Sequence, residues 1–165
     1  MSQTSIWDRA FAHISNGVVV LDEEQVVLLI SPQTLAMFHC EPGTIVPGDG
    51  LHKLLTCIGR NVGWSPERIE NIFQNHKAWK ASGEEKEIFH HYDDGTVLKI
   101  CFFPKEGEGA VLTYDDVTME HRLAALAEQR AAEADLFHRE VQSTISSVAG
   151  ATEETGRRHA DGLKA

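Results

Sequence analysis

The segment 93–118 constrains the fold of this chain more than any other stretch. It runs D-D-G-T-V-L-K-I-C-F-F-P-K-E-G-E-G-A-V-L-T-Y-D-D-V-T. Two glycine-containing turns, at 93–96 and 105–109, separate runs rich in β-branched and aromatic residues, and this pattern predicts consecutive antiparallel strands. Helix-forming residues follow directly. The sheet is therefore expected to end where a long helix begins, and the preceding chain has to supply the helices that cover the sheet.

The other elements are predicted from local patterns of the same kind. Helical spacing of apolar residues and two Ser-Pro start signals indicate helices, whereas apolar runs bounded by polar turns indicate strands. The expected helices cover residues 5–15, 32 to about 40, 51–58 and 66 to about 81. The expected strands cover residues 18–21, 26–30, 87–92, 97–103 and 110–114. Helices placed between a hairpin and a three-stranded meander predict an α+β fold, with a five-stranded antiparallel sheet and helices on one face.

Charge and cysteine content exclude several classes of function. The 165 residues suit one domain with an appendage, and the net charge of -10 disfavours a nucleic acid or an anionic membrane surface as partner. The three cysteines, Cys40, Cys57 and Cys101, are odd in number and lack a C-x-x-C, so we expect reduced thiols rather than a disulfide framework or a zinc site. No apolar run is long enough to span a bilayer, and no signal peptide is evident, so we expect a cytoplasmic protein without membrane insertion.

The chain changes character at Met119. From there to about Gly150 proline is absent and Ala, Glu, Gln, Arg and Leu dominate, which predicts a long helix. One imperfect apolar stripe runs along it, formed by Leu123, Leu126, Arg130, Phe137, Val141, Ile145 and Val148. A parallel dimeric coiled coil would bury this stripe, and packing back on the sheet is the alternative. The glycine-containing tail 151–165 is expected either to fray or to begin an output region.

Four motifs give residues 7–118 a resemblance to PAS sensor domains. They are G-V-V-V-L-D, S-P-Q-T-L-A-M-F, D-D-G-T and G-A-V-L-T-Y-D-D-V-T. The resemblance implies a PAS fold over 17–118, a helical cap over 1–16 and a signalling helix over 119–150. It also implies that Asp116 and Thr118, in the closing D-V-T, couple the sheet to that helix. Two departures are the turn D-E-E-Q at 22–25, where many such domains have D-x-x-G, and Ser31, where Asn is common.

The last helix resembles the signalling region of soluble bacterial chemoreceptors, the methyl-accepting proteins. The resemblance rests on L-F-H-R-E-V-Q-S-T-I-S-S-V-A-G-A-T-E-E-T, a helix rich in Ala, Ser and Thr with a Glu-Glu pair. It implies a sensory module that relays a signal through a dimeric helix to a chemotaxis-type output. The alternatives are the input domain of a histidine kinase and a ligand-free dimerisation module. His138-Arg139-Glu140 is similar to a kinase dimerisation box, but no proline follows it.

The resemblance also suggests where a cofactor would bind, although the sequence identifies none. Haem would need a neutral imidazole aimed into an apolar pocket, and His76 and His52 are the candidate iron ligands. A flavin such as FAD would need aromatic walls, for which Trp64 and Trp79 are the candidates. Each of these four residues also has an ordinary structural explanation, as a surface histidine or a core tryptophan.

Nothing in the sequence favours catalysis. G-x-S-x-G, H-E-x-x-H and a phosphate-binding glycine loop are all missing, and the paired carboxylates at 93–94 and 115–116 are explained by a turn and by the end of the sheet. Cys57 does not lie in the motif of light-sensing relatives. We therefore expect a protein that is not an enzyme. From the resemblance described above we also expect a homodimer that pairs through its N-terminal and C-terminal helices and binds a small molecule.

Overall fold

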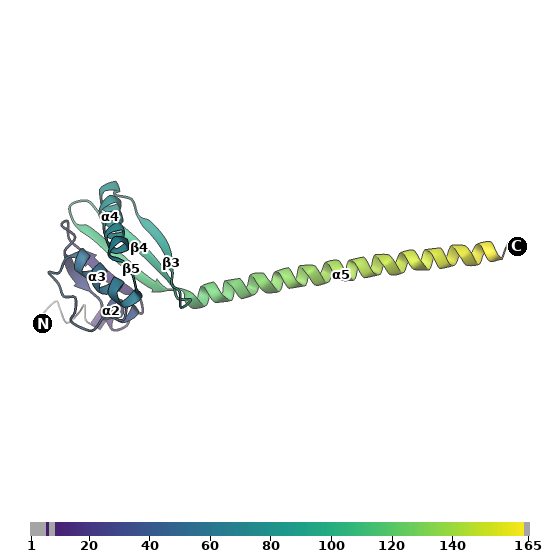
Figure 1. The fold of residues 1–165 in the computed structure, drawn as a ribbon, viewed down its shortest axis with the longest axis horizontal. Coiled ribbons are helices and arrows are strands. Elements are labelled where there is room, and N and C mark those ends of the chain that lie inside the picture. The colour runs from purple at the N-terminus through teal and green to yellow at the C-terminus, as the bar shows by residue number, and fades with distance from the viewer. Residues whose placement is uncertain (1–5, 7–8, 164–165) are drawn as a thin grey trace. The chain divides into compact units, whose positions relative to one another are not determined.

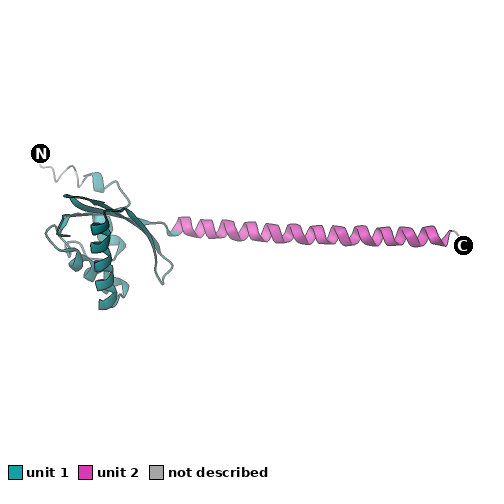
Figure 2. Cartoon of the chain, turned by 90° about the horizontal axis from the view of Figure 1, so that it is seen from above, with its two compact units in different colours: residues 1–118 teal, residues 119–165 magenta. Residues whose placement is uncertain are grey.

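The computed structural model describes residue 6 and residues 9–163. Within this part the chain divides into two compact units at the boundary between Thr118 and Met119. Figure 2 colours the two units separately. Of the helical cap expected over 1–16, residues 1–5, Trp7 and Asp8 lie outside the described residues, and 9–11 are helical.

Five antiparallel strands form one sheet, as the hairpin pattern predicted. They are β1 (Gly17–Leu21), β2 (Val27–Ile30), β3 (Lys86–His91), β4 (Val97–Lys105) and β5 (Gly109–Asp116). Their spatial order is β2-β1-β5-β4-β3, so the last strand lies at the centre, between the first strand and the fourth. The expected α+β fold is confirmed.

Three helices lie together on one face of this sheet (Figure 1): α2 (Pro32–Met37), α3 (Leu51–Val62) and α4 (Pro66–Ser82). Both Ser-Pro signals act as predicted. Ser31 Oγ accepts a hydrogen bond from the Thr34 amide, and Ser65 Oγ accepts one from the Arg68 amide. Each serine thereby satisfies an amide that the first helical turn leaves unpaired.

The expected end of this helix at residue 58 is wrong, because α3 continues through Gly59 to Val62. Gly59 is buried and serves packing rather than helix termination. A Cβ at this position would lie 2.6 Å from Ile69 Cδ1, so a larger residue would force the Ile69 side chain of α4 to move. The helix ends instead at Gly63, whose φ of +77° is the left-handed conformation typical of a helix end.

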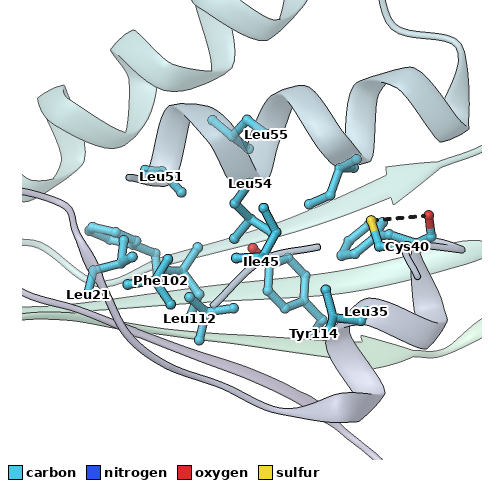
Figure 3. Close-up of a cluster of buried hydrophobic side chains, with 14 of the residues drawn as sticks. Leu21, Leu35, Cys40, Ile45, Leu51, Leu54, Leu55, Phe102, Leu112 and Tyr114 are labelled. Carbon is cyan, nitrogen blue, oxygen red and sulfur yellow. Dashed lines mark hydrogen bonds between the residues drawn. The ribbon is translucent and has the colours of Figure 1, made fainter. Parts of the chain in front are cut away.

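The core lies between the sheet and α2 and α3 (Figure 3). Cross-strand neighbours on the inner face, such as Phe102 opposite Leu112, are buried almost completely. Phe38 packs edge-on against Tyr114 with ring centroids 5.2 Å apart. Each such side chain contributes about 1.5–3 kcal/mol by leaving water. This core fixes the sheet and α3 as the rigid walls of the site described below.

The second unit begins at Met119 and contains all but the first residue of α5 (Thr118–Gly162), a helix of 45 residues. It continues past Gly150 and Gly156, which corrects the expectation of a frayed tail as far as Gly162. An isolated glycine costs a helix only about 1 kcal/mol relative to alanine, and strong helix formers surround both. None of the helices within residues 9–163 combines the length and the hydropathy needed to cross a bilayer.

Candidate functional site

A cavity of about 290 Å³ lies between α3, α4 and the inner face of the sheet. Its walls are mainly apolar and aromatic, with four polar side chains among them. The lining residues are Phe38, Leu55, Ile58, Trp64, Arg68, Ile72, Asn75, His76, Trp79, Ile88, His90, Ile100 and Tyr114. An apolar cavity with a few convergent polar groups is the usual form of a small-molecule site. We call it the inner cavity.

His76 lies in the wall of the inner cavity with only 5% of its surface exposed. Its Nδ1 is 2.7 Å from the carbonyl oxygen of Ile72, so Nδ1 carries the proton and donates it. Nε2 therefore keeps its lone pair while the ring is neutral. Burial lowers the pKa of this imidazole, although the bond to Ile72 opposes the shift. The ring packs against Trp79, with centroids 4.9 Å apart.

Both predicted tryptophans line the same cavity. Trp79 on α4 contacts Phe102 at a centroid distance of 5.8 Å. Trp64, between α3 and α4, lies edge-on to His90 at 5.7 Å, and the Arg68 guanidinium lies over its ring at 5.4 Å. The fold thus brings three of the four predicted cofactor residues together.

His52 is the exception, because it does not line the inner cavity. Its side chain is 53% exposed, and Nε2 lies 3.4 Å from a carboxylate oxygen of Glu70 on α4. The ring packs edge-on against Phe73, which also lies outside the cavity lining. His52 therefore lies on the outer surface where α3 meets α4 and is not part of the cavity wall.

Arg68 and His90 are lining residues that the sequence did not single out as a site. Arg68 Nη2 donates to His90 Nε2 across 3.3 Å, so the bonded His90 ring is neutral. The pKa of His90 is lowered by burial and by the positive charges of Arg68 and His91. Patterns in the sequence indicate that both residues face inward. Residues 68, 72, 75, 76 and 79 share one face of α4 by helical spacing, and strand alternation requires one of His90 and His91 to face inward.

A second, more polar cavity of about 370 Å³ adjoins the first and shares Trp64, Arg68 and His90 with it. The hairpin turn between β3 and β4 contributes Asp93 and Asp94. No group of three or more His, Cys, Asp or Glu side chains within residues 9–163 is arranged to hold a metal ion.

Hydrogen bonds tie the predicted relay residues to the sheet. The Thr118 amide and its Oγ1 both donate to Asp116 Oδ1, at 3.0 and 2.5 Å. Thr118 Oγ1 in turn accepts from the Val97 amide at 2.9 Å, and the Val117 amide donates to the Val97 carbonyl. The first residue of α5 is thereby bonded to the first residue of β4. We call Asp116, Val117 and Thr118 the joint.

The comparison with protein-family models decides the family. A model described as the PAS fold matches residues 11–125, well over half of the chain. The chain belongs to the PAS-fold family. The match includes the sheet, the inner cavity and the joint, and it ends within the first turns of α5.

Two solved structures show the same fold. The PAS domain of Bordetella pertussis BvgS is 18% identical, with a TM-score of 0.52, and the alignment covers 77% of this chain and 98% of that one. The phage VqmA–DPO complex is 14% identical, with a TM-score of 0.51, and the alignment covers 79% of this chain and 58% of that one. At these identities the likeness concerns the fold alone. None of the curated proteins compared with the chain matches it.

The two departures from the usual PAS motifs have structural explanations. Ser31 is fully buried, and its Oγ accepts from the Val18 amide at 2.9 Å, which joins β1 to α2. In the D-E-E-Q turn, Asp22 Oδ1 accepts from the amides of Glu24 and Val26, and Gln25 has a φ of +63°. Gln25 therefore adopts the left-handed conformation for which the family commonly supplies glycine.

Proposed function

We propose that this PAS domain is a sensory module that binds a small molecule in the inner cavity and relays its occupancy through the joint to α5. The observation that carries the proposal is the cavity itself, which is apolar over most of its wall and holds Arg68, Asn75, His76 and His90. Enclosed apolar walls supply affinity, and the few polar groups supply orientation and specificity.

The lining favours a compact ring compound with an anionic or acceptor group. Trp64, Trp79 and Tyr114 offer flat faces and edges for a ring. The Arg68 guanidinium makes no ion pair with a carboxylate within the described part of the chain, so its remaining donors are available to a ligand. A carboxylate is the group that this planar fork binds best.

Haem and FAD suit the site less well. His76 has the chemistry of an iron ligand, since it is a neutral imidazole with one nitrogen lone pair uncommitted. Small-molecule sites, however, range upward from about 300 Å³, and the inner cavity lies at that lower bound. A porphyrin or an FAD would have to lie partly outside it. We therefore propose a smaller, colourless metabolite.

The output is proposed to be a chemotaxis-type signalling region reached through a parallel dimer of α5. The side chains of Leu123, Leu126, Phe137, Val141, Ile145 and Val148 are exposed along the helix. A partner helix would cover this stripe. The Ala/Ser/Thr-rich sequence from Leu136 onward supports an output of the chemoreceptor kind rather than a kinase.

The experiment is to denature freshly purified protein and identify the released small molecules by mass spectrometry, alongside an absorbance spectrum. Ile72→Trp should fill the inner cavity and reduce the released ligand at least tenfold, whereas Val46→Trp, in an exposed loop, should leave it unchanged. Circular dichroism checks that both variants fold. If the wild-type protein carries nothing and no candidate ring carboxylate raises its Tm, the domain is a ligand-free dimerisation module. A Soret band would instead identify haem.

A further inference from the structure

Cys40 and Cys57 form a close pair of thiols in the first unit. Their Sγ atoms are 2.9 Å apart, although the residues lie in different elements. A disulfide bond measures about 2.05 Å, so a movement of about 0.9 Å would join the two sulfurs. Both residues are free cysteines, and neither lines the inner cavity. The pair is therefore distinct from the site proposed above.

The end of α2 fixes the position of Cys40. The His39 amide bonds to the Ala36 carbonyl and the Cys40 amide bonds to the Leu35 carbonyl, while His39 has a φ of +53°. This is the Schellman arrangement that closes a helix, with Cys40 at its last position. The Cys40 side chain is 6% exposed at the edge of the core, and its sulfur lies 3.8 Å from the Phe38 carbonyl oxygen (Figure 3).

Cys57 approaches from α3, with Asn61 one turn further along the same helix. The Asn61 amide nitrogen donates to the carbonyls of Phe38 and His39, at 3.1 and 2.9 Å, and lies 3.4 Å from Cys40 Sγ. These bonds hold the end of α2 against α3 and so keep the two sulfurs together. Cys57 is only half-buried, so a small oxidant in solvent reaches it before it reaches Cys40.

We propose that Cys40 and Cys57 are a reversible redox site, which a hydroperoxide converts to a disulfide. In the first step the Cys57 thiolate attacks one oxygen of the hydroperoxide and the O–O bond breaks. The other oxygen leaves and takes up one proton, as water when the oxidant is hydrogen peroxide and as an alcohol when it is an organic hydroperoxide. Cys57 is oxidised to a sulfenic acid and the peroxide is reduced. In the second step the Cys40 thiol loses its proton and attacks the Cys57 sulfur. The S–S bond forms, the S–O bond breaks, and water leaves.

The surroundings of Cys40 determine this order of events. Burial, together with the hydrogen bond and the charge of Cys57, raises the pKa of Cys40 to about 12, while the hydrogen bond from Asn61 opposes the shift. Cys40 is therefore a neutral thiol when the oxidant arrives, and Cys57 is the nucleophile. The disulfide bond then ties α3, which carries the cavity residues Leu55 and Ile58, to the end of α2.

The experiment treats the reduced full chain with hydrogen peroxide and counts thiols with Ellman's reagent after denaturation. Free thiols should fall from three to one. Trypsin cleavage after Arg9, Lys53 and Arg60 places Cys40 in the peptide 10–53 and Cys57 in the peptide 54–60, and non-reducing mass spectrometry should find these two linked. Dithiothreitol should restore all three thiols. Cys57→Ser should keep both of its remaining thiols under the same treatment.

Three results would overturn the proposal, and each is independent of ligand binding. The first is a linked peptide that contains Cys101, which lies in residues 100–105. The second is a disulfide that appears only as a covalent dimer on a non-reducing gel. The third is Cys57 oxidised to a sulfinic acid while Cys40 stays a free thiol.

Discussion

Gln25 combines two unfavourable features at one position. Its backbone is left-handed, and its buried side-chain nitrogen has no hydrogen-bond partner within the described residues. The left-handed conformation costs a residue with a Cβ about 1–2 kcal/mol, and a buried unpaired amide costs about 1–3 kcal/mol. Its carbonyl nevertheless accepts from the Leu51 amide, so the backbone is held in place.

Gln25→Gly should therefore stabilise the protein by about 1 kcal/mol, since relief of both penalties exceeds the lost packing and the added chain entropy. Urea unfolding at constant m-value measures the difference. Gln25→Ala is the matched control, because it removes the amide and keeps the strained backbone, and it should gain less than glycine does. Equal values for the two variants would mean that backbone strain plays no part.

His76 should make stability depend on pH. Burial lowers its pKa in the folded protein below the value of about 6.5 expected when unfolded. As pH falls through 6.5, the unfolded chain therefore binds a proton that the folded chain does not, and stability decreases by up to about 1.4 kcal/mol per pH unit until the folded pKa is reached. Above that range the contribution disappears.

The measurement is the unfolding free energy at pH 7.5 and pH 5.5. His76→Phe should lose less stability on acidification than the wild-type protein does, whereas His159→Phe, exposed on α5, should lose as much as the wild type. Part of the dependence should survive in His76→Phe, because the pKa of His90 is lowered in the same direction. If His76→Phe lost as much stability on acidification as the wild-type protein, the pKa of His76 would be the same in the folded and unfolded states.

At the scale of elements, the joint links the strands that line the inner cavity to the first residue of α5. His90 on β3 lines the cavity, its neighbour His91 pairs with Val97, and Val97 is bonded to Thr118. Asp116 holds Thr118 in this arrangement through Oδ1. A shift of β3 against β4 would therefore be transmitted through Val97 and Thr118 to the first turn of α5.

Asp116→Ala should uncouple the two units without weakening ligand binding, because it removes both bonds to Thr118 and touches no cavity residue. Spin labels at Ala131 of α5 would report, by the distances between the two copies, whether ligand changes the helix. Ligand should shift the distances in the wild type and not in the variant. Asp115→Ala is the control, and a normal shift in Asp116→Ala would show that the signal takes another route.

At the scale of the whole molecule, the proposed dimer would bury the exposed apolar stripe of α5. Val141→Glu should place a charge within the dimer seam and convert the protein to a monomer, since an unpaired charge is strongly disfavoured in a coiled-coil core. Sedimentation velocity measures the change. Gln142→Glu adds the same charge beside the stripe and should stay dimeric. A Val141→Glu dimer would mean that the copies pair elsewhere.

The sequence predicts features that depend on residues close together in the chain better than features that depend on contacts between distant elements. Hairpins, Ser-Pro helix starts and the α+β order rest on neighbours along the chain, and the structure has them within a few residues. The sequence pattern predicts that the helix ends before Gly59, because the role of this glycine, its close contact with α4, depends on Ile69 in another helix.

The same limit applies to the site. Spacing placed His76, Trp64 and Trp79 in the right region. The packing of α3 and α4, which spacing does not predict, leaves His52 exposed and places His76 in the cavity wall. The pairing of Cys40 with Cys57, 17 residues apart, likewise follows from how α2 ends and how α3 packs.

The central position of β5 has a consequence for how the chain folds during its synthesis on the ribosome. β1 pairs first with β2 and finds its second partner only in residues 109–116. Until these residues have emerged, the chain holds two separate hairpins with unpaired inner edges. Closure of the sheet is thus a late, long-range event, of the kind that folds slowly and exposes nascent chains to aggregation. The strand that completes the fold is also the one that leads into α5, so the helix is synthesised immediately after the segment that lets the sensor close.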